Sequence, residues 1–362
     1  MEEVVNVFDI TTLFKSFLGA NTAKGFVSRF ADSYNADEGW RAYIIKGGPG
    51  TGKSTMMKQL AAFFADKGER VELCPCSSDP DSLDAVIFHN RKVVILDGTA
   101  PHTVDPVFPG VCEKIINLCD CWDDKAFLGK EGEIIKLIRE NKTLHSKASR
   151  YISAAGGLLS ENRKTAALVL DEKKIKRFVR SLCRRMLKQG ERSSESVRFL
   201  SGITPKGMLF LRSSIAPHYK TVIALEDDLG AVGKVFFSEL RRECLKLNKS
   251  IITCYNTIDP DIIDHILLPD EGIAFCSENR LTHPEGITRR IHARRFTDMA
   301  ALAGRKQTIN FNRRAADELL REAISLIAEA KRVHDMIEKY YIDAMNFEAV
   351  GDIAARIAGE IE

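Results

Sequence analysis

Apolar and polar positions along the chain predict alternating buried strands and amphipathic helices. Consecutive apolar residues at 42–45 and 93–96 have the pattern of strands buried on both faces. After the first run, apolar residues recur on one helical face at Met57, Leu60, Ala61 and Phe64. Longer stretches of helical periodicity cover roughly 131–189 and 312–345. The pattern therefore favours an α/β protein with long helices.

The same pattern occurs twice. Four segments return in the same order about 180 residues later: 17–25 as 199–207, Gly52-Lys53 as Gly233-Lys234, 79–84 as 259–264, and 93–96 as 273–276. Such self-similarity indicates a duplicated α/β unit. We expect a P-loop NTPase-like parallel sheet flanked by helices, duplicated in tandem, each copy followed by a helical segment. The expected divisions are a P-loop NTPase domain at 1–120, a helical segment at 121–195, a degenerate P-loop-like repeat at 196–300 and a C-terminal helical segment at 301–362.

A glycine-rich stretch, Lys46 to Thr55, separates the first strand from the first helix. Its sequence, KGGPGTGKST, satisfies the G-x-x-x-x-G-K-[ST] phosphate-loop pattern in the strand-loop-helix context that the motif requires. Glycines allow positive φ angles, which turn N–H groups toward phosphate oxygens at a helix N-terminus. The expected nucleotide-binding residues are Gly47, Gly48, Pro49, Gly50, Thr51, Gly52, Lys53, Ser54 and Thr55.

Two side chains in this region have the chemistry to hold Mg²⁺. We expect Lys53 to contact the β- and γ-phosphates and Ser54 to give its hydroxyl to the metal. Asp97 ends the apolar strand 93–97, as in a Walker B element, and would hold Mg²⁺ directly or through water. An aspartate at a strand end otherwise serves as a cap or turn residue.

No catalytic base is evident. Gly98 stands where many ATPases have a glutamate, so Thr99 and His102 are candidates for sensing the γ-phosphate or positioning water. A structural role is the alternative for a lone histidine. The predicted catalytic residues are Lys53, Asp97 and His102.

The second copy loses the ligand chemistry. The positions of Gly47, Gly50, Ser54 and Asp97 are occupied there by Asp228, Ala231, Val235 and Ser277. An aspartate repels phosphate, and loss of the serine and aspartate removes both metal ligands. We therefore expect one nucleotide site in the chain.

Two charged motifs have alternative interpretations. Asp79 and Asp259, each followed by proline, suit helix N-caps, although Asp79 or Asp81 could act as the base of a kinase. In the second copy, arginines 289, 290, 294 and 295 form either a solvated basic turn or a source of an arginine finger for the first copy.

The predicted helix at 173–188 has a basic face around an apolar stripe. A solvated face over a packed stripe is favoured over a nucleic-acid surface, because neither aromatic interleaving among the basic residues nor an RNA-binding signature is present. The net charge of +3 identifies no partner. No apolar run long enough for a membrane span or signal peptide is present, and nine cysteines in C-x-C or isolated spacing suggest reduced thiols in a cytoplasm.

The segments GANTAKGF, KGGPGTGKST, CSSDPDSLD and LDGTAPH together resemble a little-characterised bacterial family of predicted ATP-binding proteins with tandem phosphate-loop domains. The resemblance covers most of the chain and implies ATP binding, with hydrolysis as a further expectation. That family commonly has a second phosphate loop like the first, from which this chain departs at Asp228, Ala231, Val235 and Ser277.

The sequence predicts a cytoplasmic, Mg²⁺-dependent ATPase whose helical regions act on a protein partner. ATP is favoured over GTP because no N-K-x-D signature is found. The alternatives are a small-molecule or nucleotide kinase, and a nucleotide-gated scaffold with negligible turnover.

Overall fold

The computed structural model describes residues 13–100 and 103–362, which form two compact units. Of the described residues, the first unit comprises 13–19, 28–100, 103–146 and 326–362, and the second comprises 20–27 and 147–325. The units interleave along the chain. They therefore differ from the contiguous divisions expected from the sequence.

The first unit contains a six-stranded sheet in the order β1-β5-β6-β7-β4-β8. Its strands are β1 (Phe14–Lys15), β4 (Arg41–Lys46), β5 (Val71–Pro75), β6 (Leu83–Phe88), β7 (Val93–Asp97) and β8 (Glu113–Asn117). All neighbours are parallel except β6, which runs antiparallel to β5 and β7. Because β6 is reversed, its start lies at the same edge as the ends of β4 and β7.

The second unit repeats this sheet strand for strand, in the order β16-β12-β15-β14-β13-β9. Its strands are β9 (Ser194–Arg198), β12 (Thr221–Glu226), β13 (Ser250–Tyr255), β14 (Ile263–Leu268), β15 (Ile273–Glu278) and β16 (Ile287–His292), and β14 is again the reversed strand. The structure thus confirms a duplicated, mixed α/β layout with two mostly parallel sheets.

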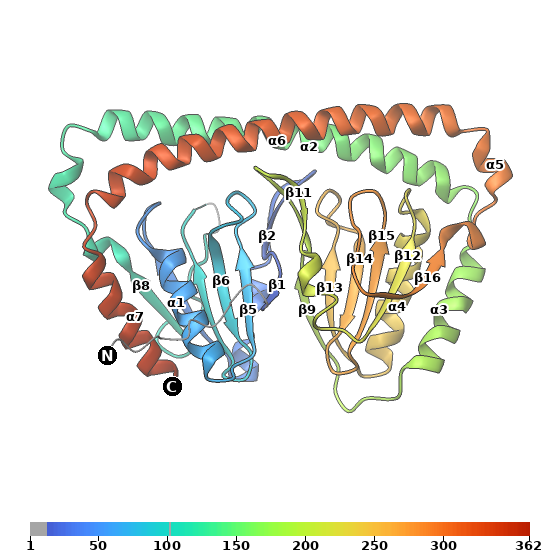
Figure 1. The fold of residues 1–362 in the computed structure, drawn as a ribbon, viewed down its shortest axis with the longest axis horizontal. Helices are drawn as coiled ribbons and strands as arrows, with labels where there is room; N and C mark the ends of the chain where they lie inside the picture. Colours follow the sequence, from blue (N-terminus) through green and yellow to red (C-terminus); the bar gives the residue numbers. More distant parts are fainter. Residues whose placement is uncertain (1–12, 101–102) are drawn as a thin grey trace, which may run out of the picture. The chain divides into compact units, whose positions relative to one another are not determined.

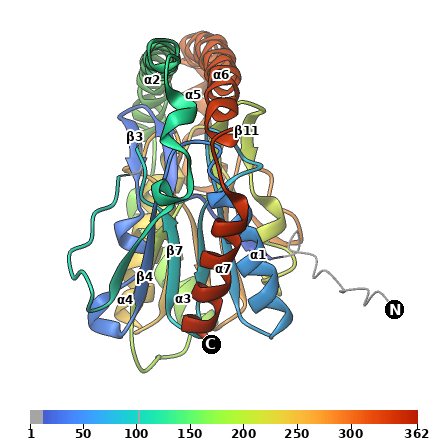
Figure 2. The ribbon, with the colours of Figure 1, turned by 90° about the vertical axis from the view of Figure 1, so that its left-hand side faces the viewer.

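One face of each sheet is covered by a pair of helices that come from different halves of the chain. In the first unit, α1 (Lys53–Asp66) packs beside α7 (Phe347–Ile361), and both contribute to one core (Figure 2). In the second, α4 (Ala231–Lys246) packs beside α3 (Glu172–Met186) (Figure 1). The apolar stripe of α3 is buried there, as expected, because it faces α4.

Two 37-residue helices, α2 (Glu131–Ala167) and α6 (Lys306–Ile342), each contribute one end to each unit. In the first unit they pack through Leu144, Ala330, Val333 and Ile337. In the second, the Asn312 amide donates to Asn162 Oδ1 at 2.9 Å. A short helix, α5 (Met299–Ala303), precedes α6. Among the described residues, none of the helices has both the length and the apolar character needed to cross a membrane.

The repeated GANTAKG and SGITPKG segments form matching hairpins. These are β2 (Gly19–Thr22) with β3 (Gly25–Ser28), and β10 (Ser201–Thr204) with β11 (Gly207–Phe210). In each, a threonine hydroxyl donates to a glycine carbonyl three residues on, at 2.8 Å. Those glycines, Gly25 and Gly207, have positive φ angles of 93° and 112°. The hairpin turn therefore accounts for the shared threonine and glycine.

Short 3₁₀ helices complete the fold: η2 (Ala31–Ser33), η3 (Ala36–Glu38), η4 (Leu118–Cys121), η5 (Asp124–Phe127), η6 (Arg212–Ser214) and η7 (Ala293–Phe296).

Candidate functional site

The glycine-rich loop, residues 47–52, joins the end of β4 to the start of α1. Gly50 and Gly52 have φ angles of 71° and 86°, which residues with a Cβ atom rarely adopt. Gly52 is the N-cap of α1, and its carbonyl accepts the first helical hydrogen bond from Met56 N at 2.9 Å. The loop thus occupies the position, between strand and helix, that its sequence predicts.

Lys53 and Asp97 meet beside this loop. The Lys53 ammonium donates to the carbonyls of Gly47 and Gly48 at 3.0 and 2.6 Å and lies 3.6 Å from Asp97 Oδ2. The contact follows from topology, because β7 lies next to β4 and Asp97 is in register with Ile45. Both side chains are largely buried, with exposed fractions of 11% and 15%, so the charges are weakly screened.

Other predicted residues have local hydrogen-bond roles. The Thr99 hydroxyl donates to Gly47 O at 2.9 Å, so it anchors the first residue of the loop. The Ser54 hydroxyl accepts from Leu83 N at 2.9 Å, at the start of β6. Thr51 donates to Gly48 O at 2.9 Å, and Thr55 is exposed. His102 lies outside the described residues.

The C-terminal end of α6 lies directly on the glycine-rich loop, a contact that the sequence analysis missed. A Cβ atom on Gly48 would lie 2.4 Å from the Tyr341 ring, and one on Gly50 would lie 2.8 Å from Glu338 O. Tyr341 is itself held by ring contacts with Trp122 and Phe127. Packing against α6 therefore requires glycine at positions 48 and 50, where phosphate binding would also require glycine.

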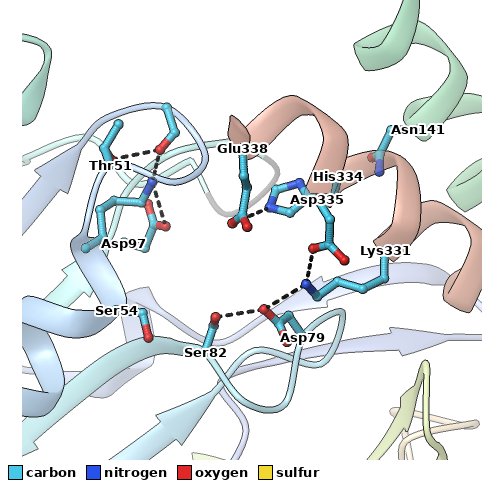
Figure 3. Close-up of polar contacts among 12 residues, drawn as sticks. Thr51, Ser54, Asp79, Ser82, Asp97, Asn141, Lys331, His334, Asp335 and Glu338 are labelled. Carbon is cyan, nitrogen blue, oxygen red and sulfur yellow. Dashed lines mark hydrogen bonds and ion pairs between the residues drawn. The ribbon is translucent and has the colours of Figure 1, made fainter. Parts of the chain in front are cut away.

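The same end of α6 brings a cluster of charged side chains to this edge of the sheet (Figure 3). His334 Nε2 lies 3.4 Å from Glu338 Oε1, and Lys331 pairs with Asp335. The bond from His334, with attraction from Lys331 and Lys53, holds the pKa of Glu338 below its usual value. Glu338 therefore stays ionised at neutral pH. Its i,i+4 spacing from His334 was visible in the sequence, but the loop it faces was not.

Asp79 belongs to the same cluster, and the structure corrects its expected role as a helix cap. Residues 79–82 form a β-turn that leads into β6, with Ser82 N donating to Asp79 O at 2.9 Å. Asp79 Oδ2 accepts from the Ser82 hydroxyl at 2.7 Å and lies 3.4 Å from Lys331 Nζ. Proline at the second turn position explains the D-P pair as well as a helix start does.

Asp259 has the equivalent place in the second unit, so its expected capping role is wrong too. Ile262 N donates to Asp259 O at 3.1 Å in a turn before β14, and Arg163 of α2 pairs with the Asp259 carboxylate. Both turns are thus tied to a basic residue of a long helix. This shared role favours a structural function for the two aspartates.

The second unit has no comparable glycine-rich loop. Its β12–α4 connection, 227–230, has four residues against six in 47–52, so Gly233 and Lys234 lie inside α4 rather than at its start. The Asp227 carboxylate lies at the start of α4, where it accepts hydrogen bonds from Gly233 N at 2.8 Å and Leu229 N at 3.3 Å. The helix N-terminus therefore already binds an anion from its own chain.

Ser277 has the same place in the second sheet as Asp97 has in the first. Ser277 is in register with Leu225 of β12, as Asp97 is with Ile45 of β4. Two of the four arginines in 289–295 have local partners within the second unit. Arg290 forms two hydrogen bonds with Glu278, and Arg295 stacks over Phe178. Among the described residues, no group of three or more His, Cys, Asp or Glu side chains is arranged to hold a metal.

No family model, curated protein or solved structure matches the chain significantly. The geometry of the first unit is consequently the basis for assigning a function.

Gly48→Ala should weaken the contact between α6 and the loop, because the new methyl group clashes with the Tyr341 ring. Hydrogen exchange at 335–345 should become faster by about tenfold, equivalent to roughly 1–2 kcal/mol of overpacking. In the double variant that also carries Tyr341→Ala, Gly48→Ala should cause little of this increase in the exchange rate. Gly132→Ala is the control, since nothing lies within 4 Å of its added Cβ. Equal effects of Gly48→Ala with and without Tyr341 would contradict the contact.

Asp264 in β14 should make the second unit less stable as pH rises. Burial raises its pKa to about 7, above the ordinary value of about 4. The folded state then keeps a proton on Asp264 that the unfolded state releases. The contribution of Asp264 to the stability of the second unit is therefore greatest below pH 4 and is lost as pH rises to about 7. Asp264→Asn should remove a slope of up to about 1.4 kcal/mol per pH unit, measured by urea unfolding at pH 5 to 7. The exposed control Asp270→Asn should leave the slope unchanged.

Proposed function

We propose that the chain is a Mg²⁺-dependent ATPase of the P-loop type, with its one nucleotide site in the first unit. The observation that carries the proposal is the meeting of Lys53, the carbonyls of Gly47 and Gly48, and Asp97 at the N-terminus of α1. A cation beside a glycine-rich turn at a helix N-terminus is suited to phosphate, because amide dipoles and ammonium charge act together.

Most of the predicted residues have a role in this proposal. The backbone N–H groups of 47–52, except Pro49, which has none, would contact the phosphates. Lys53 would leave the loop carbonyls for the β- and γ-phosphate oxygens. The donor set suits Mg²⁺, which prefers hard oxygen ligands and keeps several waters. Ser54 and Asp97 would supply those oxygens, and the ion would neutralise charge that develops on the phosphates.

Hydrolysis needs a group that orients water, and Glu338 is the best candidate. Its depressed pKa leaves it a carboxylate at neutral pH, able to accept a hydrogen bond from the attacking water. The water oxygen would bond to the γ-phosphorus as the bond to ADP breaks, and its proton would pass to Glu338 or to the phosphate. Glu338 would thereby supply the carboxylate base that is missing at Gly98.

The contact between α6 and the loop also supports a role in transmitting nucleotide state. Tyr341 and Glu338 lie against glycines that would approach the phosphates, so a shift of the loop would displace the helix. The kinase alternative gains no specific support, because the Asp79 carboxylate is already hydrogen-bonded to Ser82 and paired with Lys331. Phosphate release in MgATP without an acceptor distinguishes an ATPase from both the kinase and the scaffold.

Lys53→Ala should weaken MgATP binding by at least about 100-fold, or roughly 2.7 kcal/mol, measured by calorimetry. Lys234→Ala should bind MgATP like the unaltered chain, because Lys234 is an exposed residue inside α4. Circular dichroism should show both variants folded. An equal loss in the two variants would refute the assignment of the site to the first unit.

Glu338→Gln should lower kcat for phosphate release by about 10²–10⁴-fold while MgATP affinity changes by less than about threefold. The amide keeps the size of the side chain but is a much weaker proton acceptor. Glu329→Gln, an exposed change on the same helix, is the matched control. If Glu338→Gln hydrolyses ATP at the unaltered rate, another group orients the water.

A further inference from the structure

The second unit has a cavity of about 100 Å³ at the edge of its sheet where β12 and β15 end. All the residues that line it belong to this unit. In open parallel α/β sheets, ligands bind at this edge. The volume is small beside the roughly 300–1,000 Å³ of pockets for drug-sized ligands, so the cavity suits a much smaller molecule.

A phosphate ligand is disfavoured here by the arrangement of the chain. The amides at the start of α4 already bind the Asp227 carboxylate, at 2.8 Å for Gly233 N. Asp227 borders the cavity, as does the exposed Asp228. The lining holds four basic residues, Arg163, Lys234, Arg280 and Arg313, against four aspartates, 227, 228, 259 and 264, so it has no excess of positive charge to attract a multiply charged anion. The cavity therefore differs chemically from the proposed nucleotide site.

Several charged residues of the lining form no ion pair among the described residues. Arg313, on α6, donates only to the Asn310 amide oxygen, and the exposed Asp228 and Lys234 form no ion pair. The neighbouring Arg163, by contrast, is paired with Asp259. The Arg313 guanidinium and the Asp228 carboxylate together match a ligand that carries both charges, since Arg recognises carboxylates and Asp228 can accept from an ammonium.

The rest of the lining combines apolar and polar surface. Leu159, Met208 and Phe237 contribute apolar side chains. Within the described part of the chain, the buried hydroxyls of Ser201 and Thr257 have no hydrogen-bond partner. An unsatisfied buried hydroxyl is costly to the fold and is uncommon without a function.

We propose that this cavity binds a free α-amino acid, with its carboxylate on Arg313, its ammonium toward Asp228 and its side chain against the apolar wall. The hydroxyls of Thr257 and Ser201 then hydrogen-bond the ligand. This site is independent of the proposed ATPase activity, because its residues lie entirely in the second unit.

The test is calorimetric titration of the full chain with the twenty common amino acids, acetate and inorganic phosphate. At least one amino acid should bind saturably with Kd below about 1 mM, while acetate and phosphate bind at least about tenfold more weakly. Arg313→Gln should weaken that binding by at least about tenfold. Arg314→Gln, the exposed neighbour on α6, should bind as the unaltered chain does.

Thr257→Val separates a ligand role from a structural one. Removing an unpartnered hydroxyl should raise the melting temperature by about 2 °C and yet weaken amino-acid binding by about threefold or more. The proposal is overturned if none of the amino acids binds up to about 20 mM, if acetate or phosphate binds as tightly, or if Arg313→Gln and Arg314→Gln behave alike.

Discussion

The close approach of α6 to the glycine-rich loop is the steric constraint on which the arrangement of the first unit depends. A Cβ atom at Gly48 or Gly50 would overlap Tyr341 or the backbone of Glu338, so only a loop without side chains lets the helix lie there. Because the helix lies there, Glu338, His334 and Lys331 reach the edge of the sheet where Lys53 meets Asp97. The loop and the helix therefore form one candidate site.

The second unit shows the same architecture with different chemistry. Its sheet has the same strand order, its turn aspartate is also tied to a long helix, and its core is equally apolar. The loop is shorter, however, and Asp227 satisfies the helix amides from within the chain. Duplication thus preserves the residues that the fold needs, while the residues at the sheet edge diverge. This divergence is the physical basis for expecting different ligands in the two halves.

Local patterns predicted local structure well. The run 42–45, the glycines and the amphipathic helix that follows could be recognised because strand, loop and helix are contiguous. The role of Asp79 was mistaken because proline at position 80 fits both a helix start and a turn. The apolar run 85–88, which belongs to β6, was the signal that decides between them. Glu338 could not be found, because helical periodicity identifies the buried face of a helix but not the distant loop it covers.

Each long helix starts in one unit and ends in the other, and the helix that follows it packs beside α1 or α4 of the unit in which it ends. A half-length chain with a single copy would hold a sheet whose covering helix had to come from elsewhere. Two such chains would complete each other by domain swapping, as a symmetric homodimer does. The present chain has the connectivity of that dimer joined end to end, which makes separate expression of either half an unsuitable route to a folded fragment.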